Sequence, residues 1–252
     1  MIELLGGLIV ANCFLTAVVL YKLRKVHLAT YRIEDIANTE TKNLYKEIQA
    51  YHELVRLIRP NGPLPLLRDW AASPDFLLQV AKYVLEEKPV RILECSSGAS
   101  TLVLARCCEL NGVGRVYSLE SERKYADVTR GELIRHGVAG FATVVDAPLI
   151  GIGTDGGAKW YALDELPHEY RNVDLLVIDG PPAGAQAMAR YPALPLLIDR
   201  LAETCSIFLD DANRPGERAT LEKWKREYPE FDVNIMSMEK GAAHLSRTAR
   251  TV

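Results

Sequence analysis

The sequence predicts an α/β fold in which helices cover both faces of a mostly parallel sheet, preceded by an apolar N-terminal helix and a helical stalk. Short apolar runs alternate with helical patterns from Val90 onward, and several of these runs end on an acidic residue. Strands that alternate with helices are typical of parallel sheets, because parallel neighbours need a long crossover connection. The first 60 residues lack this alternation and begin with a long uncharged run.

The composition is that of a folded protein. The 252 residues are 48% hydrophobic and 25% charged, with a net charge of -3. These values lie near globular averages and argue against global disorder and against a polytopic membrane protein. Because there is no basic excess, we expect no nucleic-acid partner. The five cysteines lack the paired spacings of a zinc site or a disulfide framework, which favours a reducing compartment.

An N-terminal membrane anchor is expected in residues 1–25. Leu4–Tyr21 is an uncharged run of 18 residues, and a helix of this length measures about 27 Å, close to the hydrocarbon core of about 30 Å. Glu3 precedes the run and a basic cluster at 22–25 follows it, the reverse of the order in a signal peptide. The positive-inside rule then places the rest of the chain in the cytoplasm, as a single-pass protein. The alternative is a buried core helix.

Residues 26–59 contain neither Gly nor Pro and predict a helical stalk. One interpretation is a short coiled coil that makes a homo-oligomer, and the other is a single amphipathic helix that packs on the following domain. The segment 60–65 has the sequence PNGPLP and ends any helix, so the α/β domain is expected at 60–252. Apolar spacings of four and three give the candidate seam Ala37, Thr41, Leu44, Ile48, Tyr51, Val55 and Ile58.

Five buried strands are expected at 90–94, 115–120, 141–146, 173–179 and 206–210, with helices near 101–110, 121–136, 186–203 and 216–227. Late segments at 232–238 and 242–247 predict two edge strands, which makes seven strands in all.

Acidic residues terminate these expected strands. Ligands of open parallel sheets bind beyond the carboxyl ends of the strands, so the fold would gather the acids around one crevice. The alternative is that each acid caps the helix that follows. The acids are Glu94, Glu120, Asp146, Asp179, Asp210 and Asp211.

The turn after the first strand, 94–101, is rich in small residues and allows close approach of a ligand. It lacks the G-x-G-x-x-G spacing of a dinucleotide site. Glu94 suits a ligand with a cationic end, such as the amino group of a methionine moiety. Glu120 is placed to bind both hydroxyls of a ribose, and Asp146 to accept from an adenine amine.

The motifs resemble those of class I S-adenosylmethionine-dependent methyltransferases, and the resemblance spans about Leu64 to Arg247. It implies a Rossmann-like sheet, a methyl-transferring enzyme and S-adenosylmethionine as cofactor. The motifs, in order, are LECSSGAST, VYSLE, DAPL, WY at 160–161, DLLVIDGPP, ARYPALPLL and IFLDDANRPGE.

The resemblance implies a role for each matching residue. The methionine portion would contact the turn after the first strand, Glu120 the ribose, and Asp146 with Ala147 the adenine, with Asp179 also at the cofactor. The family's E-x-G-x-G-x-G departs here, because Ser96 and Ser100 stand at the outer glycines and have less backbone freedom than glycine. The turn residues in question are Glu94, Ser96, Gly98 and Ser100.

Asp179, Asp210 and Asp211 are the candidate catalytic residues. They are hard oxygen ligands that suit Mg²⁺, which would lower the pKa of a substrate hydroxyl. In a metal-free alternative, one Asp is the general base and Arg214 orients an anionic acceptor. Three acids that converge without a cation would repel one another, and this favours the metal.

The leading function is O-methylation of a glycan, lipid-linked or other small acceptor near a membrane. The alternatives are an aminopropyltransferase, in which Asp179 and Asp210 bind an amine, and a non-catalytic, membrane-tethered nucleoside-binding scaffold. Trp160 and Tyr161 form either an aromatic wall over a ligand or ordinary core. Cys95 is interpreted as a small apolar filler.

Overall fold

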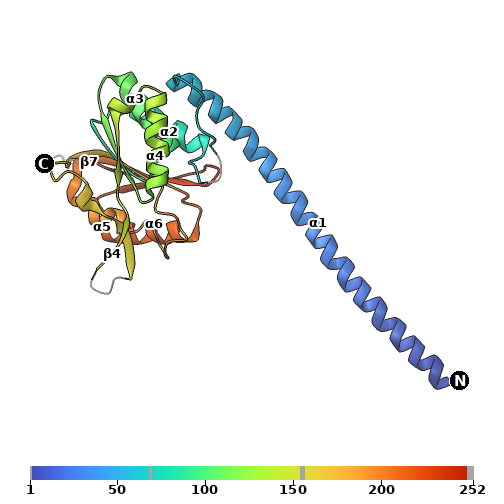
Figure 1. Ribbon diagram of the computed structural model, residues 1–252. Helices are drawn as coiled ribbons and strands as arrows, with labels where there is room; N and C mark the ends of the chain where they lie inside the picture. Colours follow the sequence, from blue (N-terminus) through green and yellow to red (C-terminus); the bar gives the residue numbers. More distant parts are fainter. Residues whose placement is uncertain (1, 68–69, 154–156, 249–252) are drawn as a thin grey trace. The chain divides into compact units, whose positions relative to one another are not determined.

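A computed structural model describes residues 2–67, 70–153 and 157–248 (Figure 1). The chain divides into two compact units, residues 1–46 and 47–252. The first unit consists of the N-terminal part of helix α1 (Ile2–Ile58), and the second contains the end of that helix together with the sheet and the other helices. The second unit, which contains the sheet, thus begins at Glu47, before the PNGPLP segment.

The sheet has seven strands, of which five adjacent ones, from β3 at one edge to β7, are parallel. Strand β9 is antiparallel to β7, and β8 is antiparallel to β9. The predicted Rossmann-like fold class is confirmed. The spatial order is β3 (Ala142–Asp146), β2 (Arg115–Glu120), β1 (Arg91–Cys95), β6 (Val173–Ile178), β7 (Leu201–Asp210), β9 (Ala242–Arg247) and β8 (Asp232–Met236).

Helices cover both faces of the sheet (Figure 1). Alternate strand residues point to opposite faces, so Ile92 lies in one apolar core and Leu93 in the other. The first core includes α2 (Pro74–Glu87), α3 (Ala99–Asn111) and α4 (Arg123–Arg135). The second includes α5 (Ala193–Leu197) and α6 (Pro215–Glu227). Short 3-10 helices lie at Ala139–Phe141, Leu163–Glu165 and Ile198–Arg200.

The last turns of α1 belong to the first core. Ala50, Leu54 and Ile58 are buried at helical spacing. The Arg106 guanidinium donates to the carbonyls of Ile58 and Arg59, at 2.9 and 2.8 Å, and holds the end of this helix. This packing favours the amphipathic-helix interpretation for 47–58, and a coiled coil farther toward the N-terminus stays a prediction.

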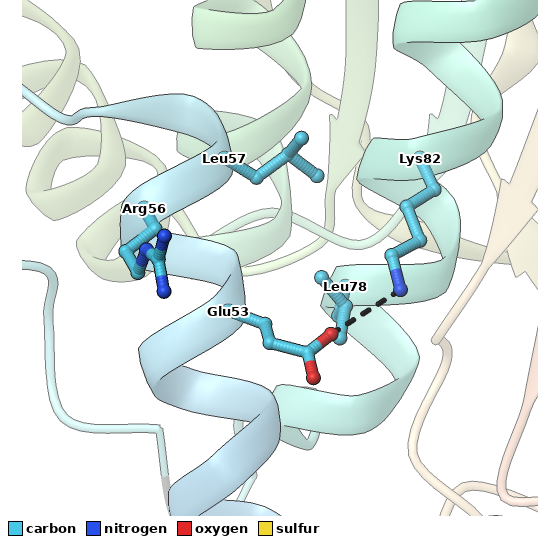
Figure 2. Close-up of a pocket in the computed structure, with 5 residues that line it drawn as sticks. All are labelled: Glu53, Arg56, Leu57, Leu78 and Lys82. Atoms are coloured by element: carbon cyan, nitrogen blue, oxygen red, sulfur yellow. Dashed lines mark hydrogen bonds and ion pairs between the residues drawn. The ribbon is translucent and has the colours of Figure 1, made fainter.

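A shallow groove of about 270 Å³ lies between the end of α1 and α2 (Figure 2). Its walls are Glu53, Arg56, Leu57, Leu78 and Lys82. The Glu53 carboxylate and the Lys82 ammonium pair across it at 3.3 Å, and both side chains are more than half exposed. An ion pair this exposed contributes little to stability.

The N-terminal part of α1 is apolar and exposed. Among the described residues, α1 is the one helix long and apolar enough to cross a bilayer, and the side chains of its apolar window are not buried. The described side chains of Leu5, Leu8 and Phe14 are each more than 60% exposed. Exposed apolar surface on this scale is unusual for a chain surrounded by water alone.

Two local features differ from the sequence prediction. The helix expected near 186–203 is short, because α5 spans only Ala193–Leu197 and β7 already begins at Leu201. Pro192 and Pro195 lack the amide hydrogen that a longer helix would need here. A hairpin of β4 (Leu149–Ile152) and β5 (Ala158–Tyr161), which the sequence did not predict, forms a separate two-stranded sheet.

Candidate active site

The turn from β1 to α3 is built around the buried carboxylate of Glu94. Its Oε2 accepts from the hydroxyls of Thr101 at 2.6 Å and Ser118 at 2.7 Å. Thr101 Oγ1 also accepts from the Gly98 amide at 3.0 Å. Ser96 has a φ of 115° and Gly98 of 149°. Ser96 therefore occupies a backbone conformation that favours glycine, as expected for a residue at a glycine position of the motif.

The other oxygen of Glu94 has no protein partner. Glu94 Oε1 is buried and accepts no hydrogen bond from the described residues. Burial raises the pKa of Glu94 to about 7, although hydroxyl donors such as those of Ser100 and Thr101 act in the opposite direction. A buried carboxylate oxygen that lacks a donor is costly. A cationic ligand group would supply both the donor and the missing charge.

Glu120 lies at the end of the neighbouring strand β2 and is prearranged by short contacts. Its Oε2 accepts from Ser97 Oγ at 2.8 Å, and its Oε1 accepts from the Glu122 amide at 3.0 Å. Ser97 Oγ also contacts Thr129 Oγ1 at 3.1 Å. Each carboxylate oxygen can accept more than one hydrogen bond, so Glu120 keeps capacity for two ligand hydroxyls.

Asp146 and Ala147 follow strand β3 beside Glu120. In the register of the parallel strands, Asp146 is directly opposite Glu120, and the Ala147 amide donates to the Glu120 carbonyl at 2.7 Å. The Asp146 side chain is half exposed and pairs with Arg130 at 2.9 Å. The adenine roles of Asp146 and Ala147 stay predictions, and one Asp146 oxygen is already engaged.

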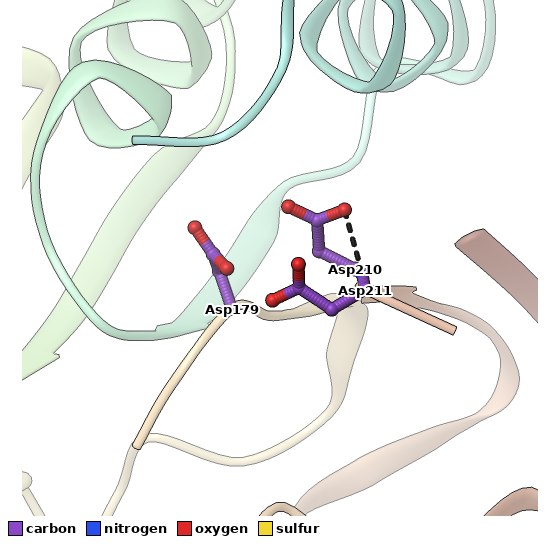
Figure 3. Close-up of side chains that lie close together, drawn as sticks. All are labelled: Asp179, Asp210 and Asp211. Carbon is purple, nitrogen blue, oxygen red and sulfur yellow. Dashed lines mark hydrogen bonds between the residues drawn. The ribbon is translucent and has the colours of Figure 1, made fainter. Parts of the chain in front are cut away.

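The ends of β6 and β7 bring Asp179, Asp210 and Asp211 together (Figure 3). One oxygen from each carboxylate lies within 4.8 Å of the others. The amides of Asp179 and Gly180 both donate to the Cys95 carbonyl at the end of β1. The expected convergence of these three acids, next to the turn that carries Glu94, is thus present in the fold.

Arg190 holds this acid cluster together, and the sequence analysis assigned it no role. Its NH2 group lies 2.6 Å from Asp211 Oδ2 and 3.2 Å from Asp179 Oδ1. Arg214 adds a second guanidinium at 2.9 Å from the same Asp211 oxygen. The premise that the acids converge without a cation was therefore wrong. The available signal was the Arg inside the ARYPALPLL motif.

The protonation of the cluster differs from that of exposed carboxylates. Burial raises the pKa of Asp179 to about 6, although Arg190 acts in the opposite direction. Burial, with the neighbouring charges of Asp179 and Asp211, also raises the pKa of Asp210 well above its usual value. Asp210 Oδ1 accepts from the Asp211 amide at 2.7 Å. The Asp179 side chain is 8% exposed and the Asp211 side chain 4%.

These contacts disagree with a magnesium site. Mg²⁺ binds carboxylate oxygens at about 2.0–2.1 Å and needs their lone pairs. Here the guanidiniums engage Asp211 Oδ2 and Asp179 Oδ1, and an amide engages Asp210 Oδ1. A buried positive charge already stands where the ion would bind.

The remaining candidates belong to the core. Trp160 and Tyr161 are buried in the second core and contact each other edge to face, with ring centroids 5.2 Å apart. A Cβ on Gly180 would meet the Tyr161 hydroxyl and the Ser96 Cβ, so glycine is required where these side chains meet. Burial raises the pKa of the Cys95 thiol, as the interpretation of an inert filler expects.

Comparisons with known proteins agree with the fold. Residues 93–212 match the model of a family described as a methyltransferase domain. No curated protein matches the sequence.

Three solved structures of similar fold are methyltransferases. A methyltransferase from Podospora anserina solved with SAH is 18% identical, with a TM-score of 0.56, covering 79% of this chain and 88% of that one. An O-methyltransferase from Bacillus cereus in complex with SAH is 18% identical, with a TM-score of 0.53, covering 79% and 91%. An O-methyltransferase from Streptomyces achromogenes, involved in tomaymycin synthesis and solved with SAM, is 15% identical, with a TM-score of 0.53, covering 82% and 96%.

The family match over residues 93–212 and the topology of the sheet identify a methyltransferase domain with the class I fold. The predictions of this fold and of this enzyme class are confirmed.

Proposed function

We propose that this protein is a membrane-anchored, S-adenosylmethionine-dependent O-methyltransferase whose acceptor is a hydroxyl of a glycan, lipid-linked or other small molecule near the membrane. The observation that carries the proposal is the buried, unpartnered Oε1 of Glu94 beside a turn of the methyltransferase type. The proposal of S-adenosylmethionine as cofactor is supported by methyltransferases of this fold that were solved with SAH or SAM.

The positive charges of S-adenosylmethionine complement the acidic side chains of the candidate active site. It carries an ammonium and a sulfonium, and Glu94 Oε1 offers a buried acceptor for the former. Glu120 binds the ribose, and Asp146 with Ala147 binds the adenine. Ser96, Gly98 and Ser100 complete the turn around the methionine portion.

In the proposed reaction, the acceptor oxygen attacks the methyl carbon, an O–C bond forms, and the S–C bond breaks. The bonding pair of the S–C bond stays on sulfur and yields S-adenosylhomocysteine. The proton of the acceptor hydroxyl goes to Asp179, because its side chain is slightly more exposed than that of Asp211, at 8% against 4%, and its pKa of about 6 suits a general base. Asp210 and Asp211 fix the end of β7 beside it, and alignment of acceptor and methyl group provides much of the rate.

Anchoring is supported by the exposed apolar face of α1 and by the basic residues at 22–25. Deleting residues 2–25 is expected to release the chain into the soluble fraction and to preserve SAH binding, because the compact unit begins at Glu47. Membrane fractionation after a salt wash measures the first effect, and calorimetry the second. A truncated chain that still pellets with bilayers would contradict the anchor. Cross-linking of the full chain in membranes tests pairing of two copies through 26–46.

Labelled cofactor tests the reaction itself. The chain is incubated with membranes and methyl-labelled S-adenosylmethionine, and label is expected in an ether-linked methyl group on an extractable acceptor. Aminopropylated product with methylthioadenosine would support the aminopropyltransferase instead. That alternative needs Asp179 to bind an amine, whereas Asp179 already pairs with Arg190. Cofactor binding without turnover would support the scaffold.

A further inference from the structure

Arg190 is buried where the two catalytic strands end. Its side chain is 2% exposed. Its NH1 donates to the Asp210 carbonyl and its NH2 to the Asp179 carbonyl, both at 2.7 Å. These are the carbonyls directly after β6 and at the last residue of β7. A single guanidinium therefore ties together the backbone of both strands at the edge where ligands of such sheets bind.

The same guanidinium supplies positive charge to the acids. It pairs with Asp211 and Asp179 through NH2, and its Nε lies 3.8 Å from the buried Glu217 carboxylate. Arginine keeps its charge under all physiological conditions, and its rigid fork suits several acceptors at once. Three carboxylates, those of Asp179, Asp211 and Glu217, and two backbone carbonyls thus surround the Arg190 guanidinium.

We infer that Arg190 takes the place of a divalent metal ion in this site, so that methyl transfer at the Asp179–Asp211 cluster is metal-independent. The inference rests on the proposed function, because it concerns how the same site organises its acids. Arg190 is a positioning residue rather than a catalytic one, since it acts through the carboxylates it holds.

Two physical reasons support the exchange of a metal for an arginine. The Arg190 guanidinium occupies the space between Asp179 Oδ1 and Asp211 Oδ2 and leaves Asp211 Oδ1 as the buried oxygen without a partner among the described residues, whereas Mg²⁺ demands a regular octahedral shell of several oxygens at short distance. In addition, Arg190 and Arg214 both pair with Asp211, and a divalent ion beside these two guanidiniums would be repelled strongly, because little solvent screens the charges. The acids would hold a divalent ion only if Arg190 were absent.

Mn²⁺ binding to the full chain in detergent micelles tests the inference, with the free ion followed by electron paramagnetic resonance. Wild type and Arg190→Lys are expected to bind no ion that depends on the cluster. Arg190→Gln removes the charge and is expected to gain about one bound Mn²⁺ per chain. The gain should disappear in Arg190→Gln/Asp211→Asn. A merely structural role of Arg190 would not produce this signal.

Arg106→Gln is the matched control. Arg106 is also largely buried, donates to two carbonyls and pairs with a carboxylate, but it lies away from the acids. It should gain no Mn²⁺. The inference is overturned if wild type binds Mn²⁺ and Asp211→Asn abolishes that binding, or if folded Arg190→Gln binds no more Mn²⁺ than wild type. Should Arg190→Gln not fold, the comparison of wild type with Asp211→Asn decides.

Calorimetry with SAH on the same samples separates the two claims. Wild type that fails to bind SAH would contradict the proposed function and leave the Mn²⁺ comparison valid. Wild type that binds SAH and also binds Mn²⁺ at the cluster would contradict only the metal-independent inference.

Discussion

The two parts of the candidate active site both use acids at strand ends, but they hold these acids in different ways. At the end of β1, Glu94 is bound only by hydroxyls, and one of its oxygens has no partner among the described residues. At the ends of β6 and β7, Asp179 and Asp211 are bound by a buried guanidinium, although Asp211 Oδ1 also lacks a partner among the described residues. Within the described part of the chain, the difference is therefore that a cation contacts the acids at the second end and none contacts Glu94 at the first.

This difference assigns the two halves of the reaction. A ligand that brings its own positive charge is stabilised at the Glu94 end, where a donor is missing. In the proposed reaction, a neutral hydroxyl acceptor lies at the Asp179 end, where guanidiniums already pair with the acids and Asp179 can take up a proton. Acids at equivalent strand-end positions can therefore have different roles, and the groups that contact each acid determine whether it binds a cationic ligand or accepts a proton.

The largest expected effect comes from breaking the charged end. Arg190→Met should lower the free energy of unfolding by about 3–5 kcal/mol, because it leaves buried carboxylates unpaired. Denaturant unfolding measures this loss. Arg135→Met is the control: its partner is Glu132 and its side chain is 66% exposed, so a change within about 0.5 kcal/mol is expected. Equal effects of the two substitutions would remove Arg190 from its central role.

Because of Glu94, we expect the free energy of unfolding to decrease as the pH rises. The folded-state pKa of about 7 lies above the ordinary value of 4.5, so the folded chain keeps its proton longer than the unfolded chain. The stabilisation of the neutral form is complete below pH 4.5 and is lost as the pH rises toward 7, by up to about 3 kcal/mol. Unfolding of ligand-free wild type and Glu94→Gln across this range measures it, and the Gln variant should lack this component. Parallel pH profiles for the two would contradict a buried, titrating Glu94.

Glu120→Ala sharpens the boundary of the cofactor half. It should weaken S-adenosylmethionine and SAH equally, since both contain the ribose, by roughly 1.5–3 kcal/mol for each lost hydrogen bond. Calorimetry with both ligands measures the change. Glu222→Ala, at a side chain that is 69% exposed, should bind as wild type does. Unchanged affinity in folded Glu120→Ala would exclude this residue from the site.

The smallest effect concerns the backbone of the turn. Ser96→Gly should raise the free energy of unfolding by about 1 kcal/mol, because the φ of 115° is strained for a serine. Ser97→Gly should lower stability instead, since it removes the hydroxyl that donates to Glu120. A thermal shift assay compares the pair. Opposite signs are expected, and a loss in both variants would mean that the Ser96 side chain is needed where it stands.

Much of the fold follows from local pattern. The runs ending at Glu94, Glu120 and Asp146 are strands within about one residue of their predicted bounds, because buried parallel strands are continuous apolar segments. The length of the helix near 186–203 was overestimated, because the prediction followed the apolar composition of the segment and gave too little weight to Pro192 and Pro195. The hairpin at 149–161 was missed because its strands are short and partly exposed.

The sequence by itself determined the order of strands and helices and the placement of acids at strand ends, because these depend on periodicity along neighbouring residues. It also determined the class of enzyme through its ordered motifs. Only the tertiary structure decided what each acid faces. Arg190 contacts Asp210 and Asp211, which lie about twenty residues farther along the chain. It does so because the segment before α5 packs against the ends of β6 and β7. Contacts of that kind depend on packing in three dimensions. The same packing decides that Asp179 and Asp211 pair with a guanidinium, whereas Glu94 contacts only hydroxyls among the described residues.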